Sequence, residues 1–145
     1  MYVVDASVWV AWFSAHDVFH DDSRQWLTGM MTGSVRLIEP VPILAEVAGA
    51  VSWTLNDEKA AERAVAMLST APLLSLLPVD LALARRAAAI ASSLGMRGYD
   101  ALYVALAEVE GMSLVSWDSD HLSRASQLVP VYRPSDLLTQ YRSDQ

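Results

Sequence analysis

Four carboxylates stand in apolar stretches of this chain, and their types and places suggest metal chemistry. They follow or interrupt the runs Tyr-Val-Val, Pro-Ile-Leu-Ala, Gly-Tyr and Leu-Val-Ser-Trp, at Asp5, Glu46, Asp100 and Asp118. An ionised carboxylate buried without a partner is costly, so it shifts its pKa, pairs with a cation or binds a metal. No basic residue is adjacent to any of the four, and the chain has a single lysine. A divalent ion is therefore the expected neutraliser.

Each acid also has a simpler interpretation as a helix cap or loop residue. Asp5 could begin a helix together with Ser7, and Asp118 could cap a helix that begins near Asp120. Glu46 and Asp100 are harder to explain in this way, because their neighbours at helical spacing are apolar and place the acids on the inward face. Two acids at strand ends and two on inward helix faces favour a shared functional site.

Length and composition limit the class of protein. The 145 residues predict a single domain, 1–145, and a hydrophobic content of 53% argues against disorder. A net charge of −7 gives no basic surface for general duplex binding, so any nucleic-acid contact must be local. The chain has no cysteine, which excludes disulfides and thiolate zinc sites. No basic segment opens the chain as in a signal peptide, and the apolar stretch 40–56 is too short and too broken to span a membrane. We expect a cytoplasmic protein.

Short apolar runs alternate with longer segments of helical period, a pattern typical of an α/β fold with a mainly parallel sheet between two helix layers, an α/β/α sandwich. We predict strands at 2–4, 35–38, 74–77, 114–116 and 128–131. We predict helices near 8–14, 18–31, 41–54, 57–70, 80–94, 99–109, 120–125 and 135–141. Ligands in such folds bind outside the carboxyl ends of the strands, where Asp5 and Asp118 are expected.

The order and context of the four acids resemble the PIN-domain family, and within it the VapC-type toxins of toxin-antitoxin pairs. Val-Val-Asp-Ala-Ser-Val-Trp is similar to the opening strand of the family, and Pro-Ile-Leu-Ala-Glu-Val to its glutamate-bearing helix. Tyr-Asp-Ala-Leu-Tyr-Val-Ala-Leu-Ala resembles the third acidic segment, and Leu-Val-Ser-Trp-Asp the last. The resemblance extends over nearly the whole chain.

This resemblance implies a PIN-like fold and a metal-dependent endoribonuclease that a cognate antitoxin holds inactive. It assigns Asp5, Glu46, Asp100 and Asp118 to the metal site, with Ser7, Ser116 and Asp120 as auxiliary candidates. Hard oxygen ligands select Mg²⁺ or Mn²⁺. The metal-free acids should repel one another, so some of their pKa values should be raised. Single-stranded or loop RNA is the expected substrate, and Arg97 is the leading candidate for a phosphate contact.

Two histidines suggest another chemistry. His16 and His20 stand four residues apart in His-Asp-Val-Phe-His, which is close to the His-Glu-x-x-His pattern of zinc proteases. An aspartate replaces the glutamate that acts as general base, so the zinc interpretation is weak. A phosphate-binding loop and a dinucleotide-binding glycine motif are both absent from the sequence.

The aromatic residues near the N-terminus indicate core and, in part, an interface. The segment from Val8 to Phe13 is apolar on every side, and a helix without a polar face is enclosed or covered by a partner. We predict a homodimer and an antitoxin surface formed by Trp9, Trp12, Phe13 and Trp53. A non-catalytic nucleic-acid-binding or protein-binding module, in which the acids are only caps, is the alternative function. Its acids would be spread apart, whereas catalytic acids would form one cluster.

Overall fold

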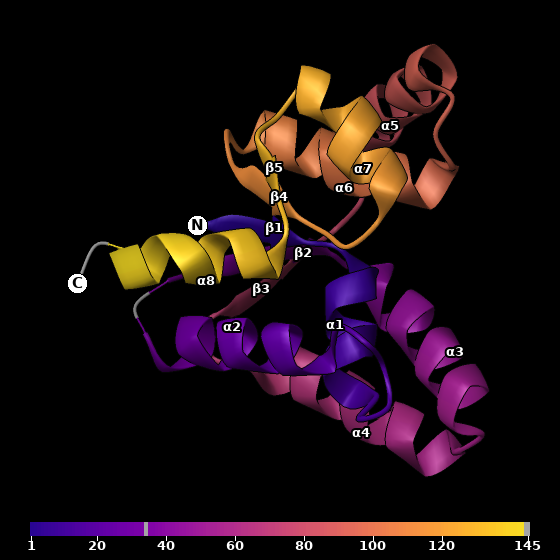
Figure 1. Ribbon diagram of the computed structural model, residues 1–145. Helices are drawn as coiled ribbons and strands as arrows, with labels where there is room; N and C mark the ends of the chain where they lie inside the picture. The colour runs from indigo at the N-terminus through magenta and orange to yellow at the C-terminus, as the bar shows by residue number, and fades with distance from the viewer. Residues whose placement is uncertain (34, 144–145) are drawn as a thin grey trace.

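The central sheet places the carboxyl ends of its strands along one edge. The computed structural model describes residues 1–33 and 35–143, and Figure 1 shows their arrangement. The five strands are β1 (Tyr2–Val4), β2 (Leu37–Pro40), β3 (Leu74–Leu77), β4 (Ser113–Val115) and β5 (Val131–Tyr132). They pair in the order β3-β2-β1-β4-β5, and all four pairings are parallel. The predicted parallel sheet is confirmed.

Helices cover both faces of the sheet, so the predicted α/β/α sandwich is also confirmed. Figure 1 shows α5, α6 and α7 on one side, with α1 to α4 on the other and α8 beside α2. The helices are α1 (Ala6–Phe13), α2 (His20–Thr32), α3 (Ile43–Leu55), α4 (Glu58–Thr70), α5 (Leu81–Leu94), α6 (Gly98–Val109), α7 (Ser119–Arg124) and α8 (Pro134–Ser143), and a 3-10 turn follows α7 at Ala125–Gln127.

The point at which the chain switches from one half of the sheet to the other lies at β1. The chain runs from β1 outward to β2 and β3, then crosses to β4 on the other side of β1 and continues to β5. The backbone N–H of Asp5 donates to the carbonyl of Val115 at 2.9 Å, which holds the ends of β1 and β4 together. A reversal of this kind opens a crevice at the carboxyl ends of the strands, where α/β folds bind their ligands.

Three predicted strand boundaries were wrong by a few residues. The largest error is at β5, which lies at Val131–Tyr132 rather than 128–131, because Leu128 closes the 3-10 turn by donating its N–H to the carbonyl of Ala125. The second strand occupies 37–40 rather than 35–38, because its pairing begins with Leu37 opposite Tyr2 and ends with Pro40 opposite Leu77. The fourth strand occupies 113–115, one residue earlier than predicted.

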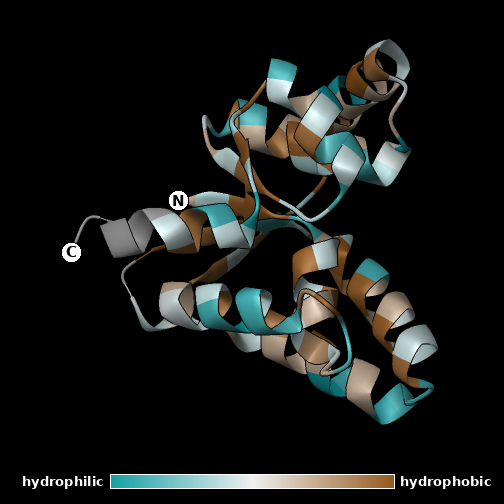
Figure 2. Ribbon diagram, viewed as in Figure 1, coloured by the Kyte–Doolittle hydropathy of each residue, from teal (hydrophilic) through white to brown (hydrophobic). Residues whose placement is uncertain are grey.

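The apolar core lies between the sheet and the two helix layers, and Figure 2 shows the hydrophobic colouring concentrated there. Trp9 is fully buried in this core, so its assignment to a partner surface was wrong. Trp12 and Phe13 are partly buried against the same core, whereas 89% of Trp53 is exposed. None of the helices among the described residues is long and apolar enough to cross a membrane.

Candidate functional site

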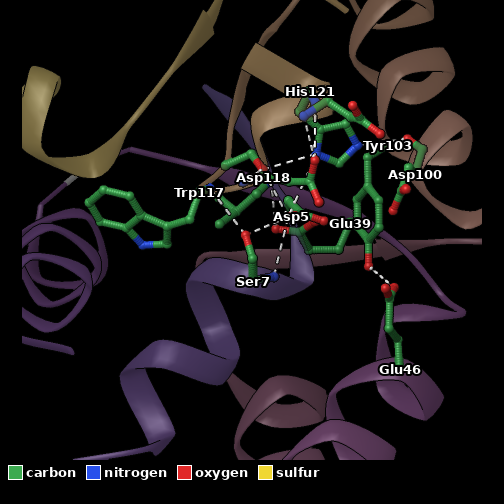
Figure 3. Close-up of polar contacts among 12 residues, drawn as sticks. Asp5, Ser7, Glu39, Glu46, Asp100, Tyr103, Trp117, Asp118 and His121 are labelled. Atoms are coloured by element: carbon green, nitrogen blue, oxygen red, sulfur yellow. Dashed lines mark hydrogen bonds and ion pairs between the residues drawn. The ribbon is translucent and has the colours of Figure 1, made fainter. Parts of the chain in front are cut away.

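Asp5 lies directly after β1 and caps the N-terminus of α1. Its Oδ2 atom accepts the backbone N–H of Ser7 at 3.3 Å and the hydroxyl of Ser7 at 2.5 Å. The Ser116 hydroxyl, from the end of β4, lies 2.9 Å from the same oxygen. Asp5 is therefore both a cap and the centre of a buried polar cluster (Figure 3).

His121, from α7, is the cationic partner of this cluster. The Ser116 hydroxyl lies 2.9 Å from Asp5 Oδ2, from the backbone nitrogen of Asp118 and from His121 Nδ1. A hydroxyl donates one hydrogen, so when it donates to the ionised Asp5 it must accept from both nitrogens. His121 Nε2 lies 3.1 Å from the carbonyl of Asp100, which can only accept. Both ring nitrogens then carry hydrogen, and the fully buried ring is an imidazolium.

The pKa values agree with this ion pair. Burial favours the neutral form of Asp5, but the hydrogen bonds and charge of His121, with the two serine hydroxyls, hold the Asp5 pKa below its usual range. For His121, burial again favours the neutral form. The ion pair with Asp5, in which Nδ1 and Oδ2 are 3.7 Å apart, and the carbonyl and charge of Asp100 raise the His121 pKa to about 9.

Glu46 and Asp100 face the cluster from the first turns of α3 and α6. The hydroxyl of Tyr103 donates to Glu46 Oε2 at 2.6 Å and orients that side chain. No residue in the described part of the chain donates a hydrogen bond to the carboxylate of Asp100. Burial raises the pKa of both acids, and the negative charge of Asp5 raises both values further, which confirms the predicted repulsion among the acids.

Asp118 and Asp120 have structural contacts at the start of α7. Asp118 Oδ1 accepts the backbone N–H of Asp120 at 2.7 Å and that of His121 at 3.4 Å, which makes Asp118 the N-cap. Asp120 forms an ion pair with Arg124 at 3.2 Å. The capping alternative therefore describes Asp118 correctly, yet this residue also faces the cleft described next.

One open cleft brings the four predicted acids together. Its volume is about 440 Å³. Besides small apolar residues, it is lined by Asp5, Ser7, Asp17, Phe19, Glu46, Arg97, Asp100, Trp117 and Asp118. The acids come from four different helix starts, so only the folded chain collects them. The four acids line one cleft and are not scattered over the surface.

The donor set of the cleft fits a hard divalent cation. One carboxylate oxygen of Asp5, one of Asp100 and a ring nitrogen of His121 lie within 4.8 Å of one another. With both ring nitrogens of His121 used as donors, the oxygens of Asp5 and Asp100 are the atoms of this group left for an ion. Glu46 and Asp118 line the same cleft but do not belong to the group. Oxygen ligands of this kind suit Mg²⁺ or Mn²⁺.

The other predicted histidines do not join this site. His20 donates its Nδ1–H to the carbonyl of Ala11 at 2.9 Å, and this hydrogen bond links the start of α2 to α1. Among the described residues, the metal-compatible group includes neither His16 nor His20. The convergence of these two side chains that a zinc site would need is not observed.

Two buried titratable residues, His121 and Glu39, are not among the predicted site residues. His121 stands three residues after Asp118, a spacing that could have indicated a partner for a strand-end acid. Glu39 is fully buried in β2, and its Oε1 accepts the N–H of Val4 at 3.0 Å and the indole N–H of Trp9 at 3.3 Å. Glu39 Oε2 has no partner among the described residues. Burial, with a smaller contribution from the charge of Asp5, raises the Glu39 pKa well above its usual value.

Comparisons with known proteins agree with this architecture. The profile of the PIN domain family matches residues 2–128, which include all four acids and His121. The chain belongs to the PIN domain family. A search by sequence among curated proteins finds no match.

Solved structures with a PIN-like fold are similar to this chain over most of their length. VapC20 of Mycobacterium tuberculosis, a toxin that cleaves the sarcin-ricin loop, has 19% identity and a TM-score of 0.75, over 89% of this chain and 97% of that one. FitAcB of Neisseria gonorrhoeae has 22% identity and a TM-score of 0.67, over 93% and 99%. VapBC2 of Rickettsia felis, bound to a promoter DNA fragment, has 13% identity and a TM-score of 0.69, over 91% and 97%. At these identities the likeness is one of fold.

Proposed function

We propose that this PIN domain is a metal-dependent endoribonuclease toxin that hydrolyses phosphodiester bonds in RNA and is neutralised by a cognate antitoxin. The observation that supports the proposal is that the carboxylates at four different helix starts all line the same open cleft. Single-stranded or loop RNA is the proposed substrate, because its backbone can bend into such a crevice. The similarity in fold to VapC20, a toxin that cleaves the sarcin-ricin loop, supports a loop as substrate.

The proposed ligands of the ion are Asp5, Glu46, Asp100 and Asp118. A bound Mg²⁺ or Mn²⁺ would lower the pKa of a water molecule and polarise the phosphoryl oxygen. His121, Ser7 and Ser116 keep Asp5 ionised and fixed in position, and the Tyr103 hydroxyl orients Glu46. Arg97, the N-cap residue of α6, lines the cleft and supplies a positive charge for a substrate phosphate.

The direct test is cleavage of single-stranded RNA by the purified protein in Mg²⁺ or Mn²⁺, with EDTA as the metal-free control. We expect cleavage that EDTA abolishes and that Glu46→Gln and Asp100→Asn each reduce by a factor of about 100 or more. Glu110→Gln, at an exposed position outside the cleft, is the matched control and should cleave like the wild type. RNA binding without cleavage in any metal would favour the non-catalytic alternative.

The proposed antitoxin has an apolar segment and a basic residue. Trp53 is 89% exposed on α3, while Trp12 and Phe13 on α1 are partly exposed, so these residues offer anchors for an apolar segment. An Arg or Lys of the antitoxin that reached the cleft would replace the charge of the ion. Titration with the product of the adjacent small reading frame should inhibit cleavage. Trp53→Ala should weaken the complex several-fold and leave cleavage unchanged. Equal affinity after this substitution would contradict the role of Trp53.

We also propose a homodimer in the cytoplasm. Light scattering of the purified protein should give twice the mass of the chain, which is 15.9 kDa. A mass equal to that of one chain across the micromolar range would contradict the dimer.

A further inference from the structure

The cleft that holds the acids continues into a second hollow. The second hollow has a volume of about 380 Å³ and is lined by Ala45, Glu46, Arg97, Gly98, Tyr99 and Asp100. Glu46, Arg97 and Asp100 line both hollows, so the two hollows lie next to each other on either side of these residues. We refer to these two hollows together as the acid groove. An extended ligand could enter on one side of the acids and leave on the other.

An aromatic stack stands in the first hollow. The rings of Phe19 and Trp117 are nearly parallel, at 10°, and their centroids are 4.2 Å apart. Phe19 is still 40% exposed, although one of its faces is stacked. Part of its ring surface is thus available to a planar ligand at the wall of the groove.

Hydrogen bonds hold this stack in place. The indole N–H of Trp117 donates to the Ser23 hydroxyl at 2.8 Å, and its backbone N–H donates to the Ser7 hydroxyl at 3.1 Å. The backbone N–H of Phe19 donates to Asp17 Oδ1 at 2.8 Å. Ser7 is also a hydrogen-bond donor to Asp5, so one hydroxyl connects the aromatic stack to the acid cluster. A platform fixed in this way loses little entropy when a ligand binds.

The second hollow has its own aromatic residue. Tyr99 is 54% exposed and lies between Arg97 and Asp100 in the sequence, at the start of α6. The groove therefore offers an aromatic ring in each hollow, and Glu46, Asp100 and Arg97 line both hollows. This alternation of aromatic, charged and aromatic residues matches the alternation of base, phosphate and base in a nucleic-acid strand.

We infer that the acid groove binds an unstacked single-stranded segment of RNA, with one nucleobase on Phe19 and another against Tyr99. The phosphodiester between the two bases then lies beside Arg97 and the acids. At a net charge of −7, long-range attraction to RNA is weak, so base stacking supplies much of the binding. Bases in a duplex are already stacked on one another and do not fit these two sites. This inference rests on the proposed ribonuclease function and names its specificity-determining residues.

The test combines protein variants with RNA oligonucleotides that lack a single base. For the wild type, removal of either base next to the cleaved bond should lower kcat/KM by about 10-fold or more. Phe19→Ala should lower kcat/KM on intact RNA by a similar factor and show no further loss when one of these bases is missing. Tyr99→Ala should do the same for the other base. Phe19→Tyr and Tyr99→Phe, which keep the rings, should retain most of the activity, and Leu81→Ala, exposed on α5 outside the groove, should change nothing.

A binding measurement separates this inference from the proposed function. In the Asp100→Asn background, RNA with 2-aminopurine at a position next to the cleaved bond should change its fluorescence on binding, and Phe19→Ala or Tyr99→Ala should remove that change. If the wild type cleaves RNA but both alanine variants match it on intact and base-deficient substrates, the inference is wrong and the proposed function stands. If the variants weaken only the antitoxin complex, the groove belongs to the protein partner and the inference is again overturned. If the wild type cleaves no RNA, the proposed function fails by itself.

Discussion

Asp5, directly after β1, and Glu39, in the neighbouring β2, are two buried acids whose surroundings act on them in opposite ways. Asp5 accepts hydrogen bonds from Ser7 and Ser116 and forms an ion pair with the buried His121. Glu39 accepts two N–H groups on a single oxygen and has no cationic partner among the described residues. The pKa of Asp5 is therefore lowered, whereas that of Glu39 is raised well above its usual value.

The difference shows that burial alone does not decide the charge of an acid. Desolvation is the largest influence on both residues, and it favours the neutral form of each. Three donors and a cation outweigh it at Asp5, but two N–H donors do not outweigh it at Glu39. Asp5 is therefore favoured as a carboxylate that can bind a metal, whereas burial favours the neutral acid at Glu39, whose Oε1 links β2 to β1 and α1 through two accepted hydrogen bonds.

The largest effect should follow from breaking the buried ion pair. In chelator, Asp5→Asn should lower the free energy of unfolding by about 3 kcal/mol, because it leaves His121 without its counter-charge. RNA cleavage should also be lost. Asp57→Asn replaces the N-cap aspartate of α4 in the same way and should cost less than about 1 kcal/mol, since Asn caps a helix as well as Asp does. Urea unfolding of the two variants measures the difference, and equal stability would contradict the ion pair.

The charge of His121 should make stability depend on pH. The folded pKa of about 9 lies above the usual value of 6.5, so the stabilisation is complete below pH 6.5 and is lost as the pH rises through 9. By linkage the loss is about 3 kcal/mol. Urea unfolding in chelator from pH 6 to 10 should show this fall in the wild type and a much flatter profile in His121→Gln. Parallel profiles would mean that His121 is neutral.

Glu39 should behave in the opposite way from Asp5. Its folded pKa is raised, so its stabilisation is complete below about pH 4.5 and is lost as the pH rises through the folded value. Glu39→Gln keeps the shape of the neutral acid and should raise stability at pH 8 by about 1 kcal/mol, with little change at pH 4. Glu62→Gln, at an exposed position on α4, should leave the profile unchanged. A less stable Glu39→Gln at pH 8 would mean that the acid is ionised in the fold.

Asp100 should show the smallest change in stability. Its carboxylate faces other acids and accepts no hydrogen bond from the described residues, so Asp100→Asn should leave stability in chelator unchanged or raise it by roughly 0.5 kcal/mol. Its loss of cleavage should nevertheless be as large as that of Asp5→Asn. Thermal melts combined with RNase assays separate the two residues. A marked loss of stability in Asp100→Asn would show that this acid also has a structural partner.

The sequence by itself determined the class of fold and the four acids. Short apolar runs between helical segments predicted a parallel sheet covered on both faces, and β1 and β3 begin and end at the predicted residues. The acids were recognisable because Asp5, Glu46, Asp100 and Asp118 interrupt apolar segments, where an unpartnered charge is costly. These are local patterns, and a chain displays them without folding.

Only the tertiary structure decided which partner each buried group has. The hydrogen bond from Ser116 to Asp5 joins residues 111 positions apart, and Glu39 reaches the N–H of Val4 across 35. The sequence did not single out His121, and Trp9 was predicted as part of a surface, because helical period shows which residues share a face but not what covers that face. The charge state of Asp5 depends on Ser116 and His121, which only the crossing from β3 to β4 brings beside it.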